Sequence, residues 1–315
     1  TWKSRGLGDV YKRQYNHCPW RWHVCSNSER VLSMKKLIYL LFLIVIAPLS
    51  SMANTCTVSS GITTVDNDSC GSQPDSYGIR MYKMYLCTSA PTEPTTSSAA
   101  VLTDGGCVLV LNGGTDGVRV DVTGSTKVNF TGATFTKPPA GVYTHGYMHI
   151  DNIFFIKQQR IFNEAKEGRV DGADSGIHCS TVSGTGNETE GKSSTCGDSA
   201  ITAGTWGSIL LDLDGGTAGL QATAEATNLN NTGIDINGIL IDTNGHTAET
   251  AGEIDSLEGF QTFGTPVVVG INLKSFDIAF GISEGSTIFQ DSNDPPVVGF
   301  GSGPFQAVIT PINHE

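Results

Sequence analysis

Short runs of apolar residues that alternate with polar ones recur along this chain, and this alternation restricts its fold more than any other feature. In Val118-Arg119-Val120-Asp121-Val122 the valines lie on one face of an extended strand and the charged side chains on the other. Turn-forming Gly and Asn separate the runs. The pattern predicts an all-β fold, an antiparallel β-sandwich of one or two units. Strands are expected at 77–86, 107–111, 118–122, 142–156, 209–213, 234–241, 267–282 and 305–309.

Two stretches have a helical alternative to this pattern. Residues 158–167, and residues 219–229 with their alanines, are each compatible with a short helix. Either helix would decorate the sheet and would not form a core element.

The first 33 residues are expected to be foreign to the folded protein. The segment Asp9-Val10-Tyr11-Lys12-Arg13-Gln14 resembles the translation of a transposon-end adaptor used in sequencing libraries. Residues 1–33 are therefore interpreted as adaptor translation followed by upstream read-through. Cys18 and Cys25 then carry no functional weight.

Residues 34–53 have the features of a signal peptide. Met34-Lys35-Lys36 is basic, and the small residues Ser51 and Ala53 stand at −3 and −1 of a cut before Asn54. An uncleaved anchor is the alternative, but the apolar run Leu37–Ala47 is too short to span a bilayer. Cleavage is expected before Asn54. The expected location is outside the cytoplasm, in the periplasm, at the cell surface or beyond, with no membrane span left after cleavage.

Export makes the remaining six cysteines candidates for disulfide bonds. The sequence alone allows 15 pairings. The preferred set joins neighbours, because each such bridge closes a short stretch rich in Gly, Ser and Thr; a metal site is the alternative, but no C-x-x-C pair supports it. The preferred bridges are Cys56 to Cys70, Cys87 to Cys107 and Cys179 to Cys196.

The chain after the expected cleavage site is strongly acidic. It keeps 11 of the 19 Lys and Arg and 29 of the 31 Asp and Glu, which gives a charge of 11 − 29 = −18. Nucleic-acid binding needs clustered Lys and Arg, so a nucleic-acid partner is not expected.

One segment divides the expected strands into two groups. Residues 167–202 contain almost no large apolar side chain and include a run rich in Gly, Ser and Thr, so they are expected to form a long loop or linker. The N-terminal β unit would then be 54–166 and the C-terminal unit 203–315. A single sandwich with a long excursion is the alternative.

Two short segments carry a resemblance to known proteins. Leu86-Cys87-Thr88-Ser89-Ala90-Pro91 and Pro138-Pro139-Ala140-Gly141-Val142-Tyr143-Thr144-His145 resemble a pattern in uncharacterised secreted proteins of marine bacteria. The second segment is also similar to a turn of prealbumin-like and fibronectin-like sandwiches. The resemblance implies a β-sandwich fold and no activity.

Catalytic motifs are weak in this chain. Gly281-Ile282-Ser283-Glu284-Gly285 matches the nucleophile elbow G-x-S-x-G, but the following Ser-Thr-Ile-Phe predicts a strand where that motif needs a helix. Asp174-Ser175-Gly176 lacks the flanking glycines of a trypsin-like nucleophile loop. His145 and His149 are expected on one face of a strand, about 13 Å apart. No catalytic residue and no enzyme activity are predicted.

Oxygen-rich turns give the only candidate metal ligands. Asp242, Asn244, Asp235 and Asn237 are the candidates for Ca²⁺, which takes six to eight oxygen ligands. The preferred interpretation is that such residues cap turns, since Gly does not fall where a calcium loop needs it.

Two classes of function remain. The first is a secreted structural or interaction protein of a surface, matrix or filament, which binds its own copies or a protein or glycan of the cell surface; Phe305 to Ile309 is a candidate edge strand for assembly. The alternative is a Ca²⁺-assisted carbohydrate- or ligand-binding module. Trp206 is the only tryptophan after residue 53, and this disfavours an aromatic sugar platform.

Overall fold

The structure is a computed structural model in which strands predominate. Among the described residues the one helical element is the 3₁₀ turn η2 (Ala251–Glu253). The expected artefact at 1–33 and the expected signal peptide at 34–53 lie outside the described residues. The all-β prediction is confirmed. The structure describes residues 55–314 apart from 67, 125–126, 171, 173, 188–190, 214–219 and 230–231.

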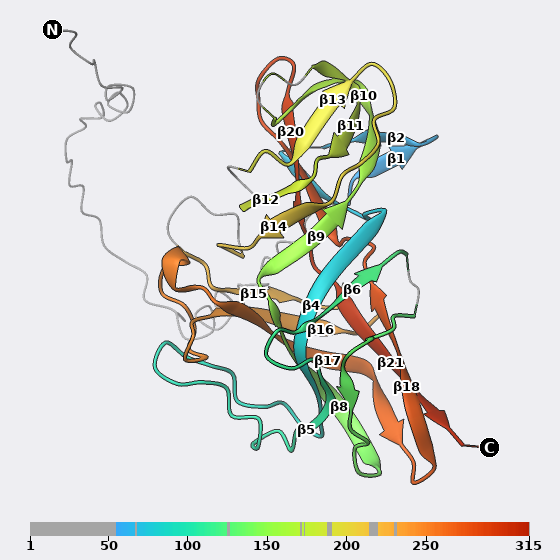
Figure 1. The fold of residues 1–315 in the computed structure, drawn as a ribbon, viewed down its shortest axis with the longest axis vertical. Coiled ribbons are helices and arrows are strands. Elements are labelled where there is room, and N and C mark those ends of the chain that lie inside the picture. The colour runs from blue at the N-terminus through green and yellow to red at the C-terminus, as the bar shows by residue number, and fades with distance from the viewer. Residues whose placement is uncertain are drawn as a thin grey trace, which may run out of the picture. The chain divides into compact units, whose positions relative to one another are not determined.

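The largest sheet, called the main sheet, is built around three long strands, β4, β8 and β17 (Figure 1). Strand β4 carries large side chains on both faces and pairs with neighbours on both edges, as a central strand does. The strands are β4 (Ser76–Cys87), β5 (Val108–Asn112), β6 (Val118–Val122), β7 (Thr134–Phe135), β8 (Gly141–Asp151), β9 (Ile153–Lys157), β12 (Gly184–Asn187), β14 (Trp206–Ile209), β15 (Thr223–Ala226), β16 (Asp235–Ile241) and β17 (Ser256–Val269).

A second sheet, called the small sheet, gathers strands from both ends of the described chain. Its strand β10 runs parallel to β2 and to β20 and antiparallel to β11, so the sheet is mixed. The strands are β1 (Thr57–Ser59), β2 (Ile62–Thr64), β3 (Ser69–Ser72), β10 (Gln159–Gly168), β11 (Ser175–Thr181), β13 (Ser194–Gly197), β19 (Ser286–Gln290) and β20 (Val297–Ser302).

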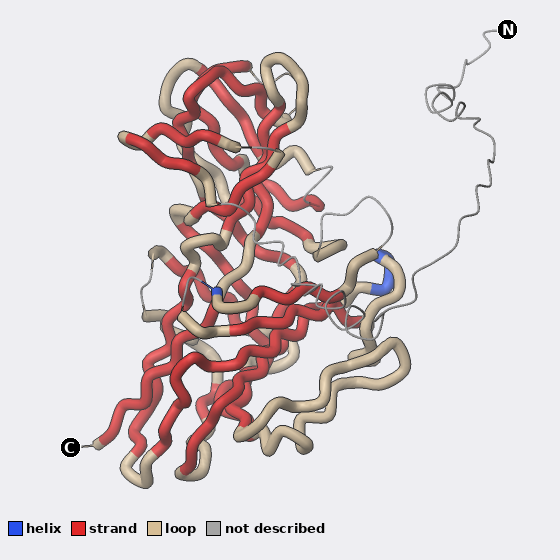
Figure 2. Tube along the Cα trace, turned by 180° about the vertical axis from the view of Figure 1, so that it is seen from behind, coloured by secondary structure: helices blue, strands red, loops and turns tan. Residues whose placement is uncertain are grey.

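A two-stranded ribbon, β18 (Leu273–Gly281) with β21 (Gln306–Asn313), closes the main core. Phe305 packs against Tyr77 and Phe154 of the main sheet and against Phe280 of the ribbon, with ring centroids 5.7 to 5.9 Å apart. Each such buried side chain stabilises the fold by about 1.5 to 3 kcal/mol. Figure 2 shows how completely strands make up this part of the molecule.

The opposite face of the main sheet is covered by a loop, residues 88–106, which we call the flap. Ala100 and Leu102 of the flap pack on Tyr147, Ile239 and Phe260. Backbone hydrogen bonds hold the flap in place, among them one of 3.0 Å from Thr247 N–H to the Thr95 carbonyl.

The three disulfides join the cysteine pairs that the sequence favoured. Cys56–Cys70 and Cys179–Cys196 lie in the core of the small sheet, together with Phe162 and Phe300. Cys87–Cys107 closes the base of the flap. Each bridge closes a short loop and restricts the unfolded chain, a contribution of about 3 kcal/mol apiece.

Both stretches with a helical alternative contain strands. Residues 159–168 form β10, and residues 223–226 form β15. Strand β10 pairs with three other strands, and this long-range pairing outweighs local helix propensity.

The segment 167–202, expected to be a loop or linker, contributes the strands β11, β12 and β13. Strand pairing also crosses the expected boundary, because β10 pairs with β20 and β9 pairs with β14. These strands pack closely although the segment has few large apolar residues, because its small serine side chains are buried and hydrogen-bonded. The buried Ser194 hydroxyl donates to the Val298 carbonyl at 2.5 Å, and Ser193 accepts from Phe300 N–H at 3.0 Å.

Candidate functional site

A groove of about 750 Å³ lies beside Arg160, and we call it the Arg160 groove. Its walls present hydroxyl and amide groups, one guanidinium and one carboxylate. The lining residues are Thr55, Cys56, Val58, Gly61, Thr63, Gly71, Ser72, Gln73, Pro74, Asp75, Gly124, Gln159, Arg160, Ile161 and Ser283.

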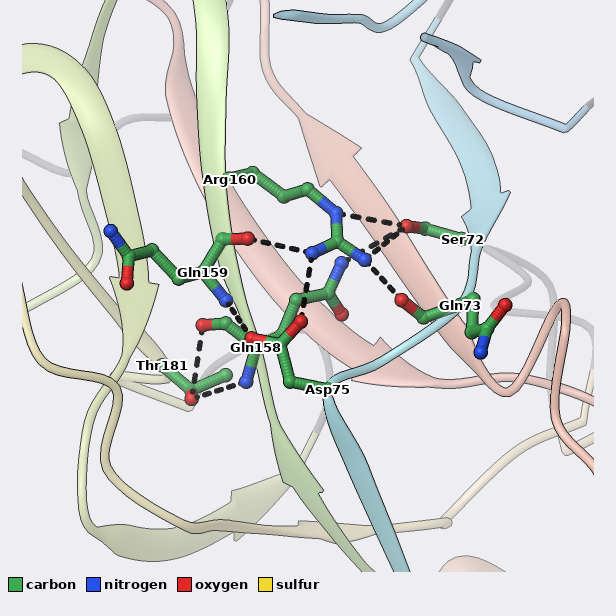
Figure 3. Close-up of polar contacts among 7 residues, drawn as sticks. All are labelled: Ser72, Gln73, Asp75, Gln158, Gln159, Arg160 and Thr181. Carbon is green, nitrogen blue, oxygen red and sulfur yellow. Dashed lines mark hydrogen bonds and ion pairs between the residues drawn. The ribbon is translucent and has the colours of Figure 1, made fainter. Parts of the chain in front are cut away.

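Arg160 uses all five of its N–H groups within the protein (Figure 3). Nε and Nη2 donate to the Ser72 hydroxyl at 3.2 and 3.0 Å, and Nη2 also donates to the Gln73 carbonyl. Nη1 donates to the Gln159 carbonyl at 2.6 Å and to Asp75 at 3.3 Å. Because no donor is left for an external anion, Arg160 joins the connection between β3 and β4 to the start of β10.

Gln158 and Thr181 extend this cluster toward β11 (Figure 3). Thr181 Oγ1 accepts from Gln158 N–H at 3.1 Å and donates to the Gly204 carbonyl at 2.6 Å. The buried Gln158 carboxamide satisfies both of its ends when Oε1 accepts from Ser72 and Nε2 donates to the Ser286 hydroxyl. The cluster is therefore a continuous hydrogen-bond network that links β3, β10, β11 and β19.

A smaller pocket, of about 240 Å³, lies between the flap and the main sheet. We call it the flap pocket. Three carboxylates and no Lys or Arg line it, so its chemistry favours a cation. It is lined by Ala90, Pro91, Glu93, His145, Gly146, Glu225, Ala226, Thr227, Asp235, Ile236, Asn237, Phe260, Gln261 and Thr262.

Two of the four predicted calcium ligands lie in the flap pocket. Asp235 accepts a hydrogen bond from Asn228 N–H at 2.8 Å. Asn237 Nδ2 donates to Glu93 Oε2 at 2.9 Å, while its buried Oδ1 accepts no hydrogen bond from the described residues.

The other two, Asp242 and Asn244, lie in the turn after β16. Asp242 Oδ1 accepts from the backbone N–H groups of His246 and Asn244, at 2.9 and 2.8 Å. The hydrogen bond from His246 is the largest cause that lowers the pKa of Asp242. This is the turn-capping role that the sequence analysis preferred. Within the described ranges no group of three His, Cys, Asp or Glu is placed to hold a metal ion, so calcium binding stays a prediction.

A buried polar pair under the flap was missed by the sequence analysis. Tyr147 Oη donates to Glu258 Oε1 at 2.7 Å; the two residues lie on the adjacent strands β8 and β17, where Glu258 is paired with His149 and Tyr147 with Phe260. Burial raises the pKa of Glu258, and the hydrogen bond from Tyr147 opposes that shift. Alternation gives the face on which Glu258 lies, but only the position of the flap shows that this face is covered.

His145 and His149 do lie on one face of β8, as expected. His149 Nε2 is 2.9 Å from Ser256 Oγ, the spacing of a base and a nucleophile. Ser256, however, is only 1% exposed, so no substrate reaches it. Burial is the largest cause that lowers the pKa of both imidazoles.

The sequence motifs with catalytic resemblance fall in strands and turns. Ser283 lies in the turn between β18 and β19, and a strand follows where the nucleophile elbow needs a helix. Ser175 begins β11. Trp206 is 4% exposed and packs against the glycines of β12, so it does not offer a surface for a sugar ring.

No helix in the part of the chain that the structure describes has the length and apolar character needed to cross a bilayer. Comparison with known proteins found no family model, no curated protein and no solved structure that matches this chain.

Proposed function

We propose that this is a secreted structural or interaction protein, a component of a surface, matrix or filament that acts without catalysis outside the cytoplasm. The observation that carries the proposal is the hydrogen bonding of Arg160. The Arg160 groove contains a single cation, and the donors of that cation are all used within the protein: most of them join the start of β10 to Ser72 and to the connection between β3 and β4. Disulfides in both sheets add covalent support to the same framework.

Self-association is the first property to test. Val142 and Val268 face each other across β8 and β17 and are 52% and 63% exposed, which is unusual for paired valines. Sedimentation of the oxidised chain over a concentration series should show association, and Val268→Lys should weaken it. Val101→Lys, which places the same charge on the flap, is the matched control. A monomer at every concentration would rule out self-assembly.

The flap pocket favours a second candidate function, a ligand-binding module assisted by Ca²⁺ with Asp235 and Asn237 among its ligands. A melting temperature that rises with Ca²⁺ and falls with chelator, on a monomer, would support it. A melting temperature unaffected by either addition would exclude the calcium role.

A further inference from the structure

Lys166 is a lysine whose side chain is only 1% exposed. Lysines are almost never buried to this degree unless they are paired. Its Nζ lies 2.6 Å from Glu164 Oε1 and 2.7 Å from the side-chain carbonyl Oε1 of Gln290. The ring centroid of Phe162 is 5.8 Å away. An amine, an amide and a carboxylate therefore meet at the edge of an apolar core.

The fold brings these groups together from distant parts of the chain. Lys166 belongs to β10 and Gln290 ends β19, and β20 lies between these two strands in the small sheet. The two residues are 124 positions apart in the sequence. A bond between them would cross-link strands that are not neighbours.

We propose that Lys166 and Gln290 form an intramolecular isopeptide bond. The Nζ–Cδ bond forms and the Cδ–Nε2 bond of Gln290 breaks, so the carboxamide nitrogen leaves as ammonia. Glu164 accepts a proton from the Lys166 ammonium, which frees the lone pair for attack, and returns it to the leaving nitrogen; the proton that Nζ loses as the amide forms leaves with the ammonia as ammonium ion. No atom is oxidised or reduced, and no co-reactant is needed.

Position and burial both favour this reaction. Lys166 Nζ already contacts Gln290 Oε1, and the carbon that it would attack, Cδ, is bonded to that oxygen at about 1.2 Å. Holding two reactants in place replaces a bimolecular step by an intramolecular one. The reaction also turns a buried ammonium into a neutral amide, which removes the cost of keeping that charge away from water.

Intact mass spectrometry of the purified full chain, after reduction and denaturation, tests the proposal. The wild-type chain should weigh less than its sequence by about 17 Da, the mass of one ammonia. Peptide mapping should find the peptides of Lys166 and Gln290 joined. A wild-type chain of full sequence mass after prolonged incubation at neutral pH would overturn the proposal and leave only a hydrogen-bonded lysine.

Variants separate this bond from other losses of ammonia, such as succinimide formation at Asn-Gly. Lys166→Met should abolish the deficit, whereas Lys157→Met, at an exposed position, should keep it. Glu164→Gln should slow the appearance of the deficit about a hundredfold, as expected for loss of a general acid–base. A deficit that persists in Lys166→Met would refute the assignment. The mass is read on the chain whether or not it assembles, so this test does not depend on the proposed function.

Discussion

At the scale of single residues, Glu258 carries a buried charge with incomplete compensation. The residue is 5% exposed; one carboxylate oxygen accepts from Tyr147, and the other accepts no hydrogen bond from the described residues. Burial raises its pKa above the ordinary value. The unfolded chain therefore releases this proton at a lower pH than the folded chain. The stability that protonated Glu258 contributes is present below its unfolded pKa and is lost as the pH rises toward the folded pKa.

Glu258→Gln should remove this loss while keeping an acceptor for Tyr147. The stability that the variant gains over wild type should be larger at pH 7 than at pH 4, because only wild type loses stability as Glu258 ionises. Each unit of difference between the folded and unfolded pKa is worth about 1.4 kcal/mol. Urea unfolding of both proteins at the two pH values measures the effect. Glu249→Gln, on an exposed residue, should change stability equally at both. If Glu258→Gln changed the free energy of unfolding equally at pH 4 and pH 7, burial would not raise the pKa of Glu258.

At the scale of strands, what the sequence predicted depends on how local the signal is. Strand β6 follows from the alternation in residues 118–122, and the disulfides follow from short loops between neighbouring cysteines. Strand β10 does not follow, because its partners β2 and β20 lie far away in the sequence. Strands β11 and β13 lack apolar bulk and depend on serine hydroxyls and Cys179–Cys196.

The candidate site shows the same division. Capping by Asp242 is local, and the turn sequence predicts it. The flap pocket combines the flap with β8, β15, β16 and β17, so no single segment reveals it. Lys166 and Gln290 carry no motif, and only the order of strands in the small sheet brings them together.

The segment Phe305 to Ile309, expected as an edge strand for assembly, already has its partners. It enters β21, which pairs with β18, and Phe305 and Ala307 are buried. The outer edge of Ala307 is bonded too: Gln261 Nε2 donates to its carbonyl at 2.7 Å, and its N–H donates to Gln261 Oε1 at 3.0 Å. Two positions further on from Ile309, Pro311 has no N–H to offer. The edge is therefore protected against strand addition.

Gln261→Leu should leave both Ala307 groups buried without partners. We expect the free energy of unfolding to fall by about 2 to 4 kcal/mol, since each unsatisfied buried group costs about 1 to 3 kcal/mol. Chemical denaturation measures the loss. Gln73→Leu, the same replacement on an exposed side chain, should stay within about 0.5 kcal/mol of wild type. Equal effects of the two changes would contradict a capping role for Gln261.

At the scale of the whole molecule, the three disulfides support different parts of the structure. Cys179 and Cys196 are register partners on β11 and β13, so their bond crosses the framework of the small sheet. Cys87 ends β4, and its bond to Cys107 returns the flap to the main sheet. The first bond restrains paired strands, and the second restrains a covering loop.

Removing each bond should therefore have different consequences, although the closed loops are similar in length. Cys179→Ala with Cys196→Ala should lower the free energy of global unfolding by about 3 kcal/mol. Cys87→Ala with Cys107→Ala should first speed amide hydrogen exchange in 88–106, because the flap opens more easily than the strands beneath it separate. Hydrogen exchange read by mass spectrometry distinguishes the two patterns. If the second variant lost protection evenly across β8 and β17 as well, the flap would be an integral part of the main sheet and not a cover for its pocket.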